Sequence, residues 1–343
     1  MSDQPGGGNG FDRSVPANGG PFAPTPSLEV DLNGLRFPTP VLGASGCFNV
    51  GRELADIVDL QRVGGIVTKS VTLRPRRGLP APRMAETASG MLNAIGLQNV
   101  GVDEFRAKDA PWIEGLRDAG TPVLVSVAGR TVEEYAQVTV RVGGLPGVVG
   151  IEANISCPNV ERRNQVFACH PDQAAEVIGT MCRLTAVPVF AKLTADVTNI
   201  VEVAEACVRA GAHGLSLVNT LLGMAIDTET FRPKLGAVTG GLSGPAMKPV
   251  ALRCVYQVAQ VFPEVPIMGI GGIRTAEDAV EFLLAGASAV QVGTASFFDP
   301  QAIVTVADGI GGFLARRGMS SPADLRGKVV NPERVPEPAH RGG

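Results

Sequence analysis

The stretch Ile267-Met-Gly-Ile-Gly-Gly-Ile273, followed at residues 289–294 by Ala-Val-Gln-Val-Gly-Thr, decides the fold. Each run is short, apolar and closed by glycine, which is typical of a parallel strand that is buried on both faces. A helical stretch separates the two runs, so together they predict a strand–helix–strand unit. Glycines at two successive strand ends also allow backbone N–H groups to converge on a phosphate.

The same alternation continues outward to the N-terminus. Short apolar runs predict strands, and a helical stretch is expected after each one. The eight strands are expected at Val41–Ser45, Gly65–Lys69, Pro122–Val127, Val148–Asn154, Val189–Leu193, Gly214–Asn219, Ile267–Ile270 and Ala289–Val292. This pattern predicts an α/β fold, a (β/α)8 TIM barrel. Before the first strand, Leu28–Phe37 predicts a β-hairpin that turns at Asn33-Gly34 and covers the bottom of the barrel.

Composition limits the domain organisation and the class of partner. We expect a disordered tail over residues 1–27, one barrel domain over residues 28–318, and a C-terminal segment and tail over residues 319–343. A formal charge of −3 gives no case for nucleic acid or an anionic membrane as a partner. No apolar run approaches the roughly 20 residues of a membrane span, and no signal peptide is evident, so we expect a cytoplasmic protein. The six cysteines form no CxxC pair, so no metal site is expected.

Three long connections leave the carboxyl ends of strands, which is the active-site face of such barrels. They are Ser70–Gly101, the loop after Cys157, and Thr220–Pro245. Long loops at this face are more often functional than not.

Polar residues at the strand ends point to one shared mouth. They are Ser45, Lys69, Ser70, Asn154, Asn159, Lys192, Asn219 and Thr220. Two lysines buried there without partners would be costly, which predicts an anionic ligand, and the asparagines suit a ligand with amide edges. The glycines at the last two strand ends, with Gly244 upstream, predict a phosphate site; the competing interpretation is that they only make tight turns.

A cysteine is the leading candidate for a catalytic base. Cys157 lies in a loop at the mouth, where a nearby lysine would lower its pKa. The competing interpretation is a small core hydrophobe. The histidines offer less, because His340 lies in the tail, His213 starts a strand on the opposite face, and His170 merely follows the Cys157 loop.

Longer motifs carry a resemblance to a known family. They are Ala44–Phe48, Thr68–Ser70, Pro82–Thr87, Gly90–Asn99, Asn154–Asn159, Asn219–Met224, Thr239–Pro245, Gly271-Gly272 and Gly293-Thr294. Together they resemble the family-1 dihydroorotate dehydrogenases, and most nearly the catalytic subunit of the NAD-linked branch, class 1B. The likeness runs from about Leu28 to Gly318.

The resemblance implies an FMN cofactor across the barrel mouth. The phosphate would rest on Gly244, Gly271, Gly272, Gly293 and Thr294, and Lys192 would face the flavin N1/O2 edge. The other cofactor-binding residues that it implies are Ser45, Gly46, Lys69, Ser70, Asn154 and Asn219.

The same resemblance implies that dihydroorotate is oxidised to orotate in pyrimidine (UMP) biosynthesis. Cys157 would remove the C5 proton while hydride passes from C6 to FMN. Lys69 would hold the substrate carboxylate. The remaining substrate-binding residues that it implies are Asn93, Ile95, Gly96, Leu97, Asn154, Asn159, Asn219 and Thr220.

The branch also implies partners. Electrons would leave to NAD through a separate subunit carrying FAD and a 2Fe-2S iron–sulfur cluster, and the catalytic chain would form a homodimer core. One segment departs from the branch: Glu161–His170 lacks the usual glycines and contains two arginines. It keeps open a paralogous FMN enzyme acting on a related cyclic amide. A flavin-free lyase with Lys69 or Lys192 as a Schiff base, and a non-catalytic phosphate-binding barrel, are the remaining alternatives.

Overall fold

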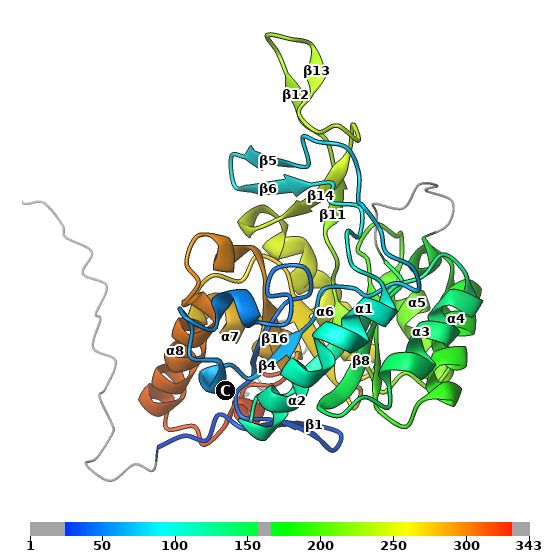
Figure 1. The fold of residues 1–343 in the computed structure, drawn as a ribbon. Coiled ribbons are helices and arrows are strands. Elements are labelled where there is room, and N and C mark those ends of the chain that lie inside the picture. The colour runs from blue at the N-terminus through cyan, green and yellow to red at the C-terminus, as the bar shows by residue number, and fades with distance from the viewer. Residues whose placement is uncertain (1–24, 157–165, 331–343) are drawn as a thin grey trace, which may run out of the picture.

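A closed barrel of eight parallel strands forms the centre of the molecule (Figure 1). The computed structural model describes residues 25–156 and 166–330. The barrel strands are β3 (Val41–Gly43), β4 (Gly65–Val67), β7 (Val123–Val127), β8 (Val148–Asn154), β9 (Val189–Leu193), β10 (Gly214–Leu217), β15 (Ile267–Ile270) and β16 (Ala289–Val292). They follow one another in chain order, and β16 pairs with β3 to close the barrel. The predicted (β/α)8 barrel is confirmed.

Three strands end two residues earlier than the sequence predicts. Strand β3 ends at Gly43, β4 at Val67 and β10 at Leu217. Beyond these ends the pairing tapers to single backbone hydrogen bonds, such as the one from Asn219 N to Leu193 O at 2.8 Å. The polar residues predicted at these strand ends therefore lie in the first turns of the loops at the mouth.

Helices cover the outside of the barrel (Figure 1). They are α1 (Val102–Lys108), α2 (Ala110–Asp118), α3 (Val132–Val142), α4 (Pro171–Leu184), α5 (Ile200–Arg209), α6 (Lys248–Val261), α7 (Ala276–Ala285) and α8 (Ala302–Arg317). Helix α5 illustrates why they form: Asn199 caps its first turn by accepting from Val201 N, and its apolar stripe, which includes Val203 and Cys207, is buried.

The expectation of a helix after every strand is wrong for the first unit. Strand β3 is followed only by two 3₁₀ turns, η1 (Arg52–Leu54) and η2 (Leu60–Arg62). The backbone takes positive φ angles of 47° at Asn49 and 78° at Gly51, which an α-helix does not allow. Trp112 fixes this segment instead by donating from Nε1 to the carbonyl of Val50 at 2.9 Å.

The N-terminal hairpin closes the bottom of the barrel, as predicted. Strands β1 (Val30–Leu32) and β2 (Leu35–Phe37) pair around Asn33 and Gly34, which both have positive φ. The side chains of Leu32 and Phe37 are fully buried. They pack against the lower interior residues of the barrel, which include Leu42, Val67, Leu124, Phe190 and Met268. The lower interior is therefore an apolar plug.

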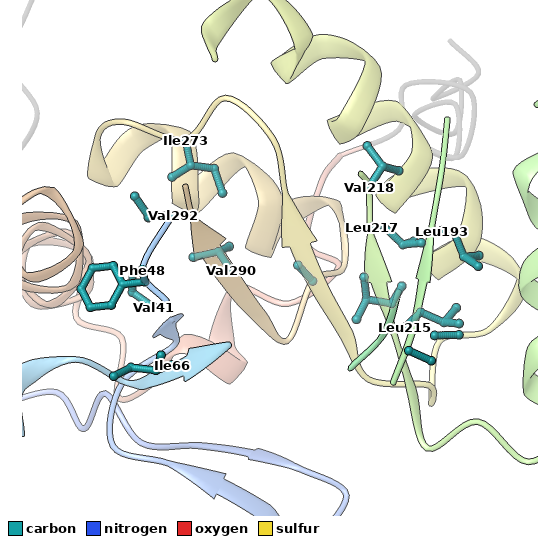
Figure 2. Close-up of a cluster of buried hydrophobic side chains, with 14 of the residues drawn as sticks. Val41, Phe48, Ile66, Leu193, Leu215, Leu217, Val218, Ile273, Val290 and Val292 are labelled. Atoms are coloured by element: carbon teal, nitrogen blue, oxygen red, sulfur yellow. The ribbon is translucent and has the colours of Figure 1, made fainter. Parts of the chain in front are cut away.

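Strand periodicity separates this plug from the layer between barrel and helices. On β9, Phe190 belongs to the interior cluster, whereas Val189, Ala191 and Leu193 belong to the larger outer cluster. Figure 2 shows part of that outer cluster, including Val41, Ile66 and Val290 of other strands. The next inward residue of β9 above Phe190 is Lys192, so the interior changes from apolar to polar towards the mouth.

Two of the long connections form a small sheet above the mouth (Figure 1). Its strands are β5 (Met84–Thr87), β6 (Gly90–Asn93), β11 (Leu221–Gly223) and β14 (Gly240–Ser243), paired antiparallel in the order β11-β14-β6-β5. A further hairpin, β12 (Ile226–Asp227) with β13 (Arg232–Pro233), extends from it. The sequence predicted only long loops here, because pairing between segments so distant in the chain leaves no local pattern.

The remaining described elements are short. The 3₁₀ turns are η4 (Phe167–Cys169), η5 (Pro245–Met247), η6 (Thr294–Phe297) and η7 (Pro322–Asp324). After α8 the chain returns to the barrel, where Arg326 donates to the carbonyls of Pro263 and Val265 at 2.7 and 3.0 Å. The two predicted tails lie largely outside the described residues, and the three-part division stays a prediction. In the described part of the chain, none of the helices has the length and apolar character needed to cross a bilayer.

Candidate active site

A cavity of about 300 Å³ opens at the carboxyl ends of the barrel strands, and residues of the small sheet, such as Met91 and Ser243, also line it. Every described residue that the sequence analysis assigned to the site lines it. These are Ser45, Gly46, Lys69, Ser70, Asn93, Ile95, Gly96, Leu97, Asn154, Lys192, Asn219, Thr220, Gly244, Gly271, Gly272, Gly293 and Thr294. Cys157 and Asn159, the other two predicted residues, lie outside the described residues. The structure thus brings segments from across the chain into one pocket.

Three glycines form a backbone cradle at one side of the cavity. Gly244, Gly271 and Gly272 have φ angles of 89°, 132° and 75°. A Cβ atom on Gly272 would lie 2.8 Å from the Cβ of Lys248 and 2.9 Å from the carbonyl oxygen of Gly244. The chain therefore needs glycine both for its backbone angles and for close packing. Such a turn beside the start of α6 exposes N–H groups that suit a phosphate.

The cradle is held by an ion pair between two helices. Lys248, at the start of α6, contacts Asp278 of α7 at 2.7 Å and Glu281 at 2.9 Å. Asp278 also accepts backbone hydrogen bonds from Arg274 and Thr275, which follow the glycines. The Lys248 ammonium and these backbone N–H groups lower the pKa of Asp278, although partial burial opposes them. The carboxylate thereby fixes the turn that carries Gly271 and Gly272.

A buried ion pair occupies the interior just below the mouth. Nζ of Lys192 lies 3.0 Å from Oε1 of Glu152, and the Nε2 of Gln291 donates to Oε2 of Glu152 at 2.9 Å. Glu152 is fully buried and Lys192 is 5% exposed. The argument that both lysines need an anionic ligand is wrong for Lys192, because Glu152 supplies the balancing charge. Sequence analysis missed Glu152, although it lies two residues before Asn154 and so on the same face of β8.

Amides and hydroxyls form a continuous network at the mouth. Asn219 Nδ2 donates to Asn154 Oδ1 at 3.2 Å and to Ser156 Oγ at 3.1 Å. Asn154 Nδ2 donates to Ser70 Oγ at 2.9 Å, and that hydroxyl pairs with Ser126 Oγ at 2.9 Å. Ser126 is a second residue that sequence analysis missed. These bonds fix the orientation of both asparagine side chains before a ligand is bound.

The end of β6 and the segment that follows it form another part of the cavity wall. Asn93 Nδ2 donates to the carbonyl of Gly241 at 3.3 Å, which ties it to β14. Gly96 and Leu97 both have positive φ, at 75° and 56°, so the chain turns sharply here. A Cβ on Gly96 would lie 2.6 Å from Cγ of Leu79. Asn93, Ile95, Gly96 and Leu97 are therefore presented to the cavity by a strained turn.

Cys47 is a described thiol in the cavity wall to which no role was assigned. Burial raises its pKa to about 11, although the ammonium groups of Lys192 and Lys69 act in the opposite direction. It is therefore a neutral thiol at ordinary pH and a poor base.

His213 lies at the other end of the barrel, as the sequence predicted. Its Nε2 is 2.9 Å from the carbonyl oxygen of Leu32, in the N-terminal hairpin.

Comparison with known proteins gives one consistent result. The family model described as dihydroorotate dehydrogenase matches residues 27–314. The chain is 53% identical over 304 residues to "Dihydroorotate dehydrogenase B (NAD(+)), catalytic subunit" of Geotalea daltonii, covering 89% of this chain and 98% of that protein. The proteins of the same name from Geotalea uraniireducens and Geobacter sulfurreducens are 51% and 49% identical, covering 89% of this chain and 99% and 98% of their own lengths.

Proposed function

This chain belongs to the dihydroorotate dehydrogenase family, and we propose that it is the catalytic subunit of an NAD-linked enzyme that oxidises dihydroorotate to orotate in pyrimidine biosynthesis. One observation carries the assignment. The described residues to which the family resemblance gives a cofactor- or substrate-binding role come from segments along most of the chain, and all of them line a single cavity at the carboxyl face of the barrel.

The family is one of flavoproteins, and we infer that the flavin here is FMN. The glycine cradle supports this, because the positive φ angles and close packing of Gly244, Gly271 and Gly272 form a turn whose backbone N–H groups would suit a phosphate. Gly293 and Thr294 would complete the phosphate site, and Lys192 would face the ring edge. When bound, FMN supplies a two-electron acceptor for the hydride that leaves the substrate.

The ring contacts follow from the rest of the cavity wall. Ser45 and Gly46 would touch the flavin ring from the turn after β3. Ser70, Asn154 and Asn219 would lie near both ring systems, because their hydrogen-bonded network lines the cavity and Asn154 lies beside Lys192 in the register of β8 and β9. This arrangement leaves the substrate on the side of the cavity lined by β6.

Substrate recognition would combine one cation with several amides. Lys69 would bind the carboxylate of dihydroorotate, and Asn93, Asn154, Asn219 and Thr220 would match the donors and acceptors of its ring, with Asn159 as a further partner. The turn at Ile95–Leu97 would close over the ring. A fixed set of amides suits a rigid ring, because few side chains need to be ordered on binding.

The proton would be removed by Cys157. A base at this position takes the proton from C5 while C6 loses hydride, so no carbanion accumulates. Cys157 follows directly on Ser156, whose hydroxyl accepts from Asn219. Ser156 thus belongs to the network of amides and hydroxyls at the mouth, and Cys157 is the next residue in the sequence.

A second subunit would carry the electrons to NAD. The name of the relatives, a catalytic subunit, implies such a partner. We infer that the partner holds FAD and a 2Fe-2S cluster, and that two copies of this chain form the core of the assembly.

The test of the partner is to compare NAD reduction by the chain alone and by the co-purified complex, with dihydroorotate as electron donor. Only the complex is expected to reduce NAD rapidly, and equal rates would remove the need for the partner.

The substrate assignment is tested by anaerobic reduction of the flavin-loaded chain. Dihydroorotate is expected to bleach the visible flavin absorption, whereas dihydrouracil, which lacks the carboxylate, should do so far more slowly. The variant Lys69→Met should lose this preference, chiefly because dihydroorotate would bleach its flavin more slowly. Equal bleaching by both compounds, or none by dihydroorotate, would instead favour a paralogue acting on another cyclic amide.

A further inference from the structure

Glu152 joins three strands inside the barrel. It extends from β8, its Oε1 accepts from Lys192 of β9, and its Oε2 accepts from Gln291 of β16. The distances are 3.0 and 2.9 Å, so both carboxylate oxygens have a partner at hydrogen-bonding distance. Gln291 thus holds one carboxylate oxygen and Lys192 holds the other.

The two charged residues lie at different depths in the barrel. In the register of β8 and β9, Asn154 lies beside Lys192, whereas Glu152 lies beside Phe190 of the apolar plug. Lys192 lines the cavity, and Glu152 is fully buried one layer deeper. The positive end of the pair therefore faces the cavity and the negative end faces the core.

A buried ion pair of this kind is rarely kept for stability alone. Desolvation of the two charges costs about as much as their attraction returns, so well-packed apolar residues are often equally stable. The plug just below shows that this barrel can be filled with apolar side chains. The pair is therefore best explained by what Lys192, the end that lines the cavity, does there.

We propose that Glu152 is a positioning residue that aims the Lys192 ammonium at the flavin ring and weakens its positive field, so that the bound flavin has a lower reduction potential than a lone lysine would give it. The proposal rests on the function proposed above. Reduction adds negative charge to the ring, and a nearby cation favours it. The carboxylate behind the cation opposes that effect and keeps the electrons available for transfer.

The direct test replaces Glu152 by Gln, which keeps the shape and an acceptor oxygen but removes the charge. The midpoint potential of bound FMN is measured by spectroelectrochemical titration, and the affinity of the flavin for sulfite, which also adds negative charge to the ring, gives a second readout. For Glu152→Gln we expect the two-electron reduction to become at least tenfold more favourable, a rise of about 30 mV. Sulfite should bind about tenfold more tightly, in the same sense.

Matched variants separate this role from a structural one. Ser216→Ala alters another buried inward residue, which pairs in register with Lys192, and should leave the potential at the wild-type value. Glu152→Asp keeps the negative charge, so its flavin potential should lie much nearer to the wild-type value than that of Glu152→Gln. If Glu152 had only a structural role, Glu152→Gln would lower the melting temperature and the FMN occupancy but leave the potential of the bound FMN unchanged. That result would overturn the proposal.

A double variant keeps the test decisive if Glu152→Gln does not fold. Lys192→Met with Glu152→Gln removes both buried charges, so it avoids an unpaired ion. Because the positive end of the pair is the nearer one to the cavity, the double variant should have a lower flavin potential than the wild type. A potential equal to or above the wild-type value would contradict the proposal. Failure of the wild-type chain to bind FMN would instead refute the proposed function, before any variant is compared.

Discussion

Asn219 donates from Nδ2 to Oδ1 of Asn154 at 3.2 Å, and this bond joins the ends of β10 and β8 across the intervening strand β9. Asn154 continues the connection to Ser70, after β4, at 2.9 Å. Amides from separate βα units are therefore oriented by one another. A ring bound in the cavity meets a surface whose side chains have already lost most of their rotational freedom.

Asn154→Ala is expected to lower kcat/KM for dihydroorotate at least tenfold. The change removes the partner of Asn219 and of Ser70, and each lost bond to a partly buried polar group costs about 1–3 kcal/mol. Steady-state kinetics measure this. Ser126→Ala removes only the hydroxyl contact to Ser70 and should have a smaller effect. An Asn154→Ala enzyme with wild-type kcat/KM would contradict the role of the network.

Gly272→Ala is expected to destabilise the chain by about 1–3 kcal/mol and to weaken FMN binding more than tenfold, because the new Cβ meets backbone that cannot yield easily. Gly318→Ala is the matched control. Gly318 also has a positive φ, of 63°, but its Cβ would meet nothing within 4 Å. Urea unfolding of the apoprotein and flavin fluorescence titration separate the two effects. Equal loss of FMN affinity in both variants would argue against the cradle.

Cys157→Ala should retain FMN and lose turnover by roughly 10²–10⁴-fold, the usual contribution of a general base. The flavin content follows from the absorption spectrum, and turnover from orotate formation. Cys169→Ala controls for the loss of a thiol from a nearby part of the sequence, since Cys169 lies in η4 and is not among the residues that line the cavity. Normal orotate formation by Cys157→Ala would show that another group removes the proton.

Cys47 should make stability fall with rising pH in the alkaline range. Burial raises its pKa from 9.0 to about 11, so above pH 9 the unfolded chain loses this proton while the folded chain keeps it. One such group lowers the free energy of unfolding by about 1.4 kcal/mol per pH unit between these two values. Urea unfolding of the wild type and Cys47→Ala at pH 8 and pH 10 measures the difference. If the free energy of unfolding changed equally with pH in the two proteins, the raised pKa of Cys47 would be contradicted.

The barrel was predictable because parallel strands are apolar on both faces and end in recognisable turns. Strand Ile267–Ile270 and the glycines after it were placed from their pattern alone. The first unit was not, because Asn49 and Gly51 take left-handed backbone angles that no apolar period reveals. The small sheet was missed for a related reason. Its strands β6 and β14 are paired although they lie far apart in the chain, so no local sequence pattern reveals the pairing.

The candidate site was predictable as a set of residues and less so as a set of contacts. Motifs placed Lys192 and Asn154 at one mouth, and the cavity confirms that they lie together. Periodicity on β8 offered Glu152 as an inward residue, but its pairing with Lys192 depends on the register of two strands. The catalytic assignment of Cys157 lies outside the described residues and stays a prediction.

The flavin released from the purified chain tests the central claim most directly. Heat-denatured protein is expected to release FMN in a one-to-one ratio to polypeptide, identified by chromatography and by its phosphate, because we propose that the glycine cradle and Lys192 hold a phosphorylated flavin. A chain that stays colourless after incubation with excess FMN, or that releases a different flavin, would contradict the account.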